Sequence, residues 1–290
     1  MTSTLPYTST LYRCPLCREP LFPEASTPEQ NLFSQSVSKQ TSYRCINRHH
    51  FDVAKEGYLN LLPVQHKNSK QPGDSKAMLQ QRRQFLESGA YQPLVSALAE
   101  QLQHLAPARM LDSGCGEGYY SAQLKAALPA TEFAGMDISK SAIQLAAKRY
   151  PDIAFCVASA KTLPYGDQQF DGMLVLCAPF ELAEVKRCLR PGGFLMLVTA
   201  APEHLLQFKQ TIYKEVRLHS DAVQALAGFQ HVRRQHCRFM LEQLGADAYL
   251  SLLDMTPLGW KLPQQQKQQL CQSLTQLQAD FYIDSYQYGS

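Results

Sequence analysis

Short apolar runs alternate with helical stretches between residues 91 and 220. Each run has the length of a strand, and a segment of helical length separates it from the next. We therefore expect strands at 109–111, 132–136, 153–157, 172–176 and 194–199, and helices at 121–128, 141–150 and 181–189. Because a strand, a crossover and a parallel strand almost always wind right-handed, this pattern predicts an α/β fold with a doubly wound, Rossmann-like sheet.

A glycine-rich turn follows the first predicted strand. Gly114, Gly116 and Gly118 stand at alternate positions, and glycine lets the backbone turn tightly and approach a ligand closely. The spacing differs from the G-x-G-x-x-G pattern of dinucleotide sites. Asp112 precedes the loop and Glu117 lies within it. Two carboxylates would repel a pyrophosphate, so the loop favours a ligand that carries positive charge.

Asp137 ends the second predicted strand, about 20 residues after the glycine loop. In sheets of this kind a carboxylate at that offset hydrogen-bonds a ribose diol, although aspartate is also common at helix N-termini. S-adenosylmethionine suits both features, because its sulfonium and ammonium groups match the acidic loop and its ribose matches Asp137. The sequence therefore predicts this cofactor.

Three of the nine cysteines cluster with histidine near the N-terminus. Cys14 and Cys17 form a C-x2-C pair, and Cys45 is followed by His49 and His50. Three thiolates and one imidazole suit a tetrahedral, structural zinc site. We favour His49 as the fourth ligand and keep His50 as the alternative. Free, reduced cysteines without a metal are the other interpretation.

A basic connector follows the cysteine-rich region. Its lysines and arginines lie in a stretch with a single acidic residue, and apolar residues at 78–86 repeat at helical spacing before Gly89. We expect a helix whose apolar face docks while its basic side chains point outward. The candidate contacts to RNA phosphates are Lys55, Lys67, Lys70, Arg82 and Arg83. An ordinary solvated helix face is the alternative.

Composition adds few limits. A net charge of +3 does not by itself indicate a nucleic-acid partner, and no apolar run reaches the roughly 18 residues that a membrane helix needs. The first residues show no secretory pattern, so we expect a cytoplasmic protein without membrane contact. After residue 220 the pattern is less regular, although Leu270, Leu274 and Leu277 predict an amphipathic helix within 264–278.

The glycine loop, Asp137, Leu163-Pro164-Tyr165 and Arg190-Pro191-Gly192-Gly193 resemble class I S-adenosylmethionine-dependent methyltransferases over residues 91–220. This resemblance implies a class I methyltransferase sheet. Ser159 is a departure, because many relatives place an aspartate there to hold the adenine amino group, and a hydroxyl accepts that bond more weakly.

A more specific resemblance covers essentially the whole chain. The zinc-ligand spacing, the stretch Lys55-Glu56-Gly57-Tyr58, the Gly89-x-Tyr91 pair and Met255-Thr256-Pro257 with Trp260 resemble bacterial 23S rRNA guanine-N1 methyltransferases, the RlmA family, in its Gram-negative type. The resemblance implies a homodimer that methylates N1 of a guanine in hairpin 35 of 23S rRNA domain II. Some members of the family serve as macrolide resistance factors.

The chain divides into regions of different texture at about residues 62 and 90. With the resemblance, we expect a zinc-binding RNA-recognition domain at 1–62, a basic connector and helix at 63–90, and a methyltransferase domain at 91–290. The expected cofactor site comprises Tyr91, Asp112, Gly114, Gly116, Gly118, Tyr119, Tyr120, Asp137, Ser159 and His204.

No catalytic residue is assigned from the sequence. Glu117 and His204 are weak candidates for the base that accepts the N1 proton. A covalent role for Cys177 is disfavoured, because deprotonated N1 carries its own nucleophilic lone pair.

Two other functions remain open at this point. A class I methyltransferase that acts on a small molecule, such as a quinone, is one, and the zinc cluster and basic connector argue against it. A zinc-ribbon adaptor with an idle methyltransferase fold is the other, and the intact glycine loop with Asp137 argues against that.

Overall fold

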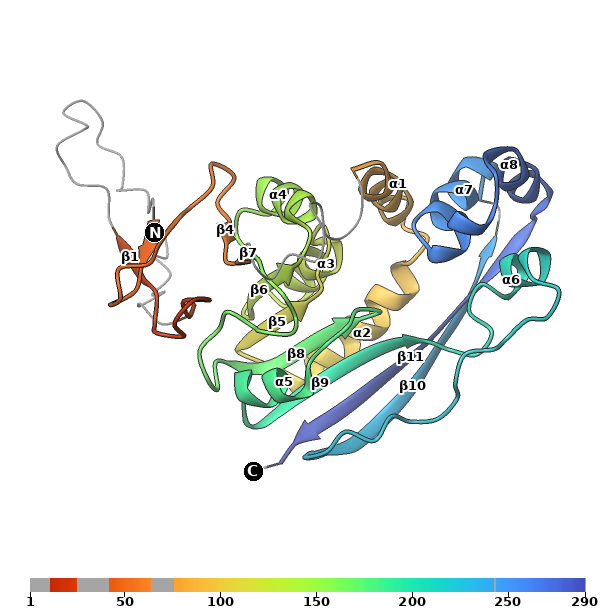
Figure 1. Ribbon diagram of the computed structural model, residues 1–290. Helices are drawn as coiled ribbons and strands as arrows, with labels where there is room; N and C mark the ends of the chain where they lie inside the picture. Colours follow the sequence, from red (N-terminus) through yellow and green to blue (C-terminus); the bar gives the residue numbers. More distant parts are fainter. Residues whose placement is uncertain (1–10, 25–41, 64–75, 243, 290) are drawn as a thin grey trace.

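The computed structural model describes residues 11–24, 42–63, 76–242 and 244–289 (Figure 1). Within these residues a small sheet contains β1 (Phe22–Glu24), β2 (Ser42–Arg44) and β3 (His50–Asp52), all antiparallel. A large sheet contains β4 (Leu59–Asn60), β5 (Arg109–Ser113), β6 (Glu132–Asp137), β7 (Ala154–Val157), β8 (Phe170–Leu176), β9 (Leu189–Ala200), β10 (Phe229–Glu242) and β11 (Gln276–Tyr288). Its strand order is β10-β11-β9-β8-β5-β6-β7-β4.

The five predicted strands are confirmed as β5 to β9, and they pair in parallel. Helices connect them at α3 (Tyr119–Ala127), α4 (Lys140–Arg149) and α5 (Leu182–Cys188), close to the expected ranges. Two helices lie between β4 and β5, namely α1 (Lys76–Glu87), as predicted before Gly89, and α2 (Gln92–Leu105). The order turns back at β5, which confirms the doubly wound, Rossmann-like arrangement.

Alternating strand residues feed two hydrophobic clusters, one on each face of the sheet. Met110 and Phe155 belong to the cluster that also contains residues of α2, α3 and α4. Their neighbours Leu111 and Cys156 belong to the other cluster, which contains residues of α5 and of the N-terminal segment. The N-terminal segment therefore covers part of a sheet face and shares its core.

Backbone and aromatic contacts fix this docking. The Arg13 amide donates to the Pro164 carbonyl at 2.8 Å, and the Gly166 amide donates to the Leu11 carbonyl at 3.1 Å. The Tyr12 and Tyr165 rings stack with centroids 5.5 Å apart. Further along, β4 extends the large sheet by pairing in parallel with β7. The predicted boundary at residue 62 falls just after β4.

The region after residue 220 is regular in structure although its sequence pattern is less regular. β10 and β11 form a long antiparallel hairpin, and β11 pairs antiparallel with β9. Between them lie α7 (Ala246–Asp254), a 3-10 helix η3 (Pro257–Lys261) and α8 (Gln264–Ser273), while α6 (Leu206–Ile212) precedes the hairpin. The predicted helix at 264–278 is therefore correct only as far as Ser273, because Leu277 is a buried residue of β11.

The strands after residue 220 could not be predicted from the sequence because β10 is rich in arginine and histidine. These side chains pair across the sheet with two buried carboxylates of β11: His231 and Arg234 contact Asp284, and His236 and Arg238 contact Asp280. The partners lie far apart in the sequence, so no local pattern shows the pairing. No described helix is long and apolar enough to cross a membrane.

Candidate functional site

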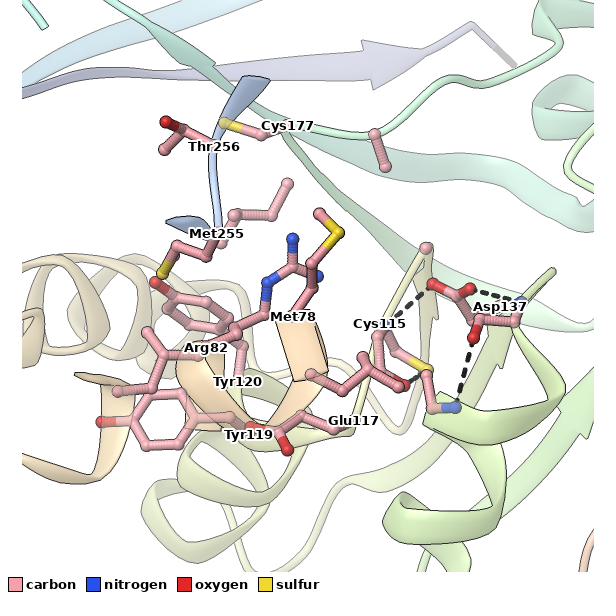
Figure 2. Close-up of a pocket in the computed structure, with 18 of the residues that line it drawn as sticks. Met78, Arg82, Cys115, Glu117, Tyr119, Tyr120, Asp137, Cys177, Met255 and Thr256 are labelled. Atoms are coloured by element: carbon pink, nitrogen blue, oxygen red, sulfur yellow. Dashed lines mark hydrogen bonds between the residues drawn. The ribbon is translucent and has the colours of Figure 1, made fainter. Parts of the chain in front are cut away.

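A cavity of about 470 Å³ opens at the carboxyl ends of β5, β6 and β8 (Figure 2). Its walls come from the loops after these strands, from α1, and from residues 255–260 beside α7. The volume lies within the range of about 300–1,000 Å³ that is typical of small-molecule sites. Ligands of doubly wound sheets bind at this edge, so this cavity is the candidate cofactor site.

The glycine loop forms one wall of the cavity. Gly114, Gly116 and Gly118 have φ angles of +85°, +57° and +81°, the left-handed region that favours glycine. A Cβ atom on Gly114 would lie 2.5 Å from the Cβ of Ala178, so the loops after β5 and β8 touch. Gly114 and Gly116 line the cavity, whereas Gly118 caps α3 and packs on Phe155.

Asp137 ends β6 and faces the cavity while it holds the loop in place. Its Oδ2 accepts a hydrogen bond from the Gly116 amide at 3.0 Å, and its Oδ1 accepts one from the Ser139 amide at 2.7 Å. These two bonds fix the orientation of the carboxylate at the cavity wall. The helix N-cap role that competes for this residue belongs to Ser139, whose hydroxyl accepts from the Ala142 amide.

Two further acids line the same cavity. Burial and the nearby charge of Asp137 raise the pKa of Asp112 to about 7, although a 2.6 Å hydrogen bond from the Ser121 hydroxyl opposes the shift. Burial also raises the pKa of Glu117 to about 7, against the pull of Arg83, Arg149 and Arg82. These two carboxyl groups resist ionisation, so a cationic ligand would bind in exchange for their protons.

The remaining predicted cofactor residues fall into two groups. Tyr91, Tyr119, Tyr120 and His204 line the cavity. Ser159 does not line it: its hydroxyl accepts from the Lys161 amide in the turn after β7. The contact of Ser159 with adenine therefore stays a prediction.

His204 is held as a neutral ring. Its Nδ1 accepts a hydrogen bond from the Asp280 amide at 3.2 Å, so the proton is on Nε2. Burial, together with the positive charges of Lys209 and His219, lowers the pKa of His204 to about 3. A ring in this state donates from Nε2 and is a poor proton acceptor, which removes His204 as a candidate base.

Arg82 lies elsewhere than the sequence suggested. It was expected on the outer face of α1, but its side chain lines the cavity and reaches from α1 toward its centre (Figure 2). Arg83 is on the outer surface and pairs with Glu87 at 3.0 Å. The reason is that α1 packs its buried Leu79 and Phe85 inward, which turns Arg82 toward the glycine loop. Among the other predicted RNA contacts, Lys55 is exposed, while Lys67 and Lys70 lie outside the described residues.

Cys177 follows β8 with a φ of +48° and exposes its thiol to the cavity. Protein atoms on the walls of the cavity surround the Cys177 sulfur and desolvate it, which raises the pKa of the thiol to about 11, although the positive charge of Arg82 opposes this shift. A thiol with a raised pKa is a poor nucleophile at neutral pH. The expectation against covalent catalysis therefore has a physical basis.

The metal cluster assembles at the other end of the molecule. The ligand atoms of Cys14, Cys17, Cys45 and His49 all lie within 4.8 Å of one another. The Sγ atoms of Cys17 and Cys45 are 3.6 Å apart, close to the roughly 3.8 Å expected for tetrahedral zinc with Zn–S bonds of about 2.3 Å. Thiolate and imidazole donors in this arrangement fit zinc.

His50 is not part of this cluster. Its Nε2 contacts Glu24 at 3.2 Å and its Nδ1 contacts Asp52 at 3.4 Å. The His49 Nδ1, in contrast, lies 3.4 Å from the sulfurs of both Cys14 and Cys45. The geometry therefore selects His49 as the fourth ligand.

Two knuckle turns place the four ligands. The Arg18 amide donates to the Cys14 carbonyl and the Arg48 amide to the Cys45 carbonyl. Arg18 and Arg48 have φ angles of +65° and +64°, so both turns use the left-handed region without glycine. Because neither turn contains glycine, the turn residues do not mark the site in the sequence. The cluster could be predicted only from the spacing of its ligands.

The sequence missed several residues that line the cavity. Met255, Thr256, Pro257 and Trp260 come from η3 and the residues before it, and Pro179 comes from the loop after β8. The Met-Thr-Pro run and Trp260 had been singled out only as part of a resemblance. Nothing local in their sequence indicates that they lie beside a glycine loop more than 130 residues earlier.

Two family models match the chain. One, described as the RlmA N-terminal zinc ribbon, matches residues 12–70, which contain the four-ligand cluster. The other, a methyltransferase domain, matches residues 110–193, which contain the glycine loop and Asp137.

Curated relatives match most of the chain. YxjB of Bacillus subtilis strain 168, named provisionally as a 23S rRNA (guanine-N(1)-)-methyltransferase, is 31% identical over 271 residues, which are 87% of this chain and 88% of that protein. The 23S rRNA (guanine(748)-N(1))-methyltransferase of Streptomyces fradiae is 32% identical over 260 residues, 86% of this chain and 85% of that protein. A Bacillus halodurans structure, described provisionally as a methyltransferase, is 14% identical with a TM-score of 0.46 and covers 66% of this chain and 99% of that one.

Proposed function

This chain belongs to the family of 23S rRNA (guanine-N1)-methyltransferases, and on that premise we propose that it methylates N1 of a guanine in hairpin 35 of domain II. Its cofactors are S-adenosylmethionine and zinc. The observation that carries the proposal is the presence of two sites on one sheet: a cavity lined by acids at the sheet edge, and a three-cysteine, one-histidine cluster packed on a face of the same sheet.

We assign the cofactor to the part of the cavity beside Asp137. Asp137 would hold the ribose hydroxyls, because its carboxylate lines the cavity at the end of β6 and two backbone amides fix its orientation. Asp112 and Glu117 would face the positively charged methionine part. When bound, S-adenosylmethionine supplies the methyl group, and the backbone of Gly114 and Gly116 allows its close approach.

The protein must also accept the proton that leaves guanine N1. With His204 held as a hydrogen-bond donor, Glu117 is the remaining candidate of the two, and once the bound cofactor has displaced its proton, its carboxylate is in the form that accepts one. The Nε2–H of His204 is free to donate to a ligand in the cavity. Guanine N1 is accessible only in an unpaired or flipped base, which a hairpin loop supplies at low cost.

The test of this function is methyl transfer to RNA. Purified protein, labelled S-adenosylmethionine and deproteinised 23S rRNA from a modification-deficient strain should give label at one guanine, mapped by primer extension. A parallel reaction with a quinone-containing lipid extract tests the small-molecule alternative. Label in the extract and none in the rRNA would overturn the proposal.

Several finer features remain proposals. The Gram-negative type, with its choice of guanine, and the homodimer rest on the family resemblance, whereas a cytoplasmic location and the division at residues 62 and 90 rest on the sequence pattern. The curated relative from Streptomyces fradiae is named for guanine 748, so mapping the modified nucleotide in the assay above also decides the type.

The acidic cavity predicts a pH dependence of cofactor binding. In the free protein Asp112 and Glu117 have pKa values near 7, and a cation in the cavity would lower them. Binding therefore releases protons, so affinity should rise with pH, by about eightfold per linked group between pH 6 and pH 7.5. Calorimetry in buffers of different ionisation enthalpy measures both the affinity and the proton release.

Asp112→Asn is the matched control for this dependence, because it keeps the size of the side chain and removes one titrating group. It should weaken binding at pH 7.5 and make the pH profile shallower. An affinity that stays constant or falls between pH 6 and 7.5 in the unaltered protein would contradict the linkage.

Arg82 and Arg83 are adjacent in the sequence and should differ in function. Arg82→Ala removes a cation from the cavity wall and should lower kcat/KM for rRNA by roughly 10- to 100-fold, with little change in the salt dependence of RNA binding. Arg83→Ala should instead weaken RNA binding and reduce the slope of log K against log salt concentration by about the amount that one phosphate contact contributes. Methylation kinetics and filter binding at several salt concentrations separate the two, and equal effects of both variants would contradict the placement of Arg82.

A further inference from the structure

Trp260 is the single tryptophan of the chain, and 70% of it is exposed to solvent. Tryptophan is highly buried on average, so an exposed indole calls for an explanation. Among the exposed large hydrophobic side chains of the described residues, Trp260 alone also lines the cavity. Its exposure is therefore located at the mouth of the site and is not scattered over the surface.

The backbone that carries Trp260 is firmly packed. A Cβ atom on the preceding Gly259 would lie 2.7 Å from the Leu253 carbonyl oxygen, so η3 rests directly on the end of α7. The Thr256 hydroxyl donates to the same carbonyl at 2.8 Å. The Ser251 hydroxyl of α7 in turn donates to Gln81 of α1 at 2.6 Å. The backbone that carries Trp260 is thus fixed at the rim by contacts that also connect it to α1, which forms a wall of the cavity.

The cavity is not acidic throughout. Asp112, Glu117 and Asp137 line it, and Figure 2 shows Met255, Thr256 and Cys177 away from Asp137. Pro179 and Trp260 also line the cavity, so apolar and aromatic groups stand beside the polar ones in its wall. An aromatic plane with apolar neighbours is the surface on which RNA-binding proteins stack unpaired bases.

We propose that Trp260 is the stacking platform for the target guanine as this base enters the cavity. The inference rests on the proposed function and adds the residue that receives the flipped base. Stacking tolerates any base, so Trp260 would supply affinity and orientation, while polar groups deeper in the cavity would supply the choice of guanine. In this role Trp260 positions the base for methyl transfer without taking part in proton movement.

The unaltered protein offers a direct test, because Trp260 is its only tryptophan. The probe is a synthetic hairpin with the sequence of the hairpin 35 loop, compared with a hairpin that has an abasic site at the target nucleotide. We expect the intact hairpin to quench the tryptophan fluorescence. The abasic hairpin, at saturating concentration, should leave most of the fluorescence intensity unquenched. Equal quenching by both, or none by either while RNA binds, would overturn the proposal.

Substitutions give an independent measurement. Trp260→Ala and Trp260→Leu should lower kcat/KM for the hairpin by roughly 10- to 100-fold, and Trp260→Phe, which keeps a π-face, should recover most of the loss. Cofactor affinity by calorimetry should stay unchanged in all three. Tyr213→Ala is the matched control, because Tyr213 is an exposed aromatic residue outside the cavity, and it should leave kcat/KM unchanged.

The two failures are distinguishable. If the unaltered protein transfers no methyl group to the hairpin or to 23S rRNA, the proposed function fails. If it does so and Trp260→Ala has the same kcat/KM, only the stacking role fails. The thermal midpoint of each variant shows that it is folded, and a side chain this exposed should cost little stability when it is replaced.

Discussion

Replacing Cys45 by serine should abolish rRNA methylation while cofactor binding persists. The Cys45 thiol is buried in the four-ligand cluster, and structural zinc supplies about 10–16 kcal/mol of binding free energy in small zinc peptides. Without the metal, the segment around the cluster has too few core residues to keep its turns. We expect loss of stoichiometric zinc, measured by mass spectrometry, and a fall in kcat/KM for 23S rRNA of at least about 100-fold.

Cofactor binding should survive because no described residue before α1 lines the cavity. The affinity for S-adenosylmethionine, measured by calorimetry, is expected to remain within about threefold of the unaltered protein. The thermal midpoint should fall, since Cys45 and Leu21 share a hydrophobic cluster with Tyr165 and Phe170 of the sheet region.

His50→Ala is the matched control for this experiment. His50 is the histidine next to the ligand His49, but it pairs with Glu24 and Asp52 on the surface. The variant should retain zinc, cofactor binding and most of the methylation activity. Zinc loss in His50→Ala, or full methylation by zinc-free Cys45→Ser, would contradict the assignment of the cluster.

Local patterns were enough to predict the central sheet and both candidate sites. Apolar runs of strand length, separated by helical segments, predicted β5 to β9 correctly. The pattern works because each strand of a parallel sheet is buried on both faces and is therefore apolar along its length. The alternate glycines gave the loop because their left-handed φ angles exclude most other residues. The spacing of the cysteines and His49 gave the metal cluster because two short turns bring all four ligands together.

Features that depend on contacts between residues far apart in the sequence could not be predicted from local patterns. β10 is a strand in which His231, Arg234, His236 and Arg238 contact the buried Asp280 and Asp284 of β11, so the strand resembles an irregular polar segment when its sequence is taken alone. The direction of Arg82 depends on how α1 packs over the glycine loop. Trp260 reaches the cavity only because α7 packs on α1. In each case the tertiary contact, and not the local pattern, determines the position.

Replacing Asp137 by alanine should remove cofactor binding. Its carboxylate is fixed by the amides of Gly116 and Ser139 and faces the cavity, and hydrogen bonds to a charged acceptor contribute about 1.5–3 kcal/mol each. Loss of two such bonds to a ribose diol, with loosening of the loop, should raise the Kd for S-adenosylmethionine by at least about 100-fold. Isothermal titration calorimetry measures the change directly.

Asp171→Ala separates the loss of a ligand contact from the loss of an anchoring carboxylate. Asp171 is also fixed by the chain, because it accepts from the Arg109 amide at 2.7 Å and pairs with Arg190 at 2.8 Å, but it lies at the start of β8 and does not line the cavity. Both variants should lose some thermal stability, and only Asp137→Ala should lose cofactor affinity. Because Asp137→Asn keeps an acceptor without the charge, we expect it to fall between alanine and the unaltered protein. Undiminished affinity in Asp137→Ala would remove Asp137 from the cofactor site and leave the acidic loop as the remaining support for its location.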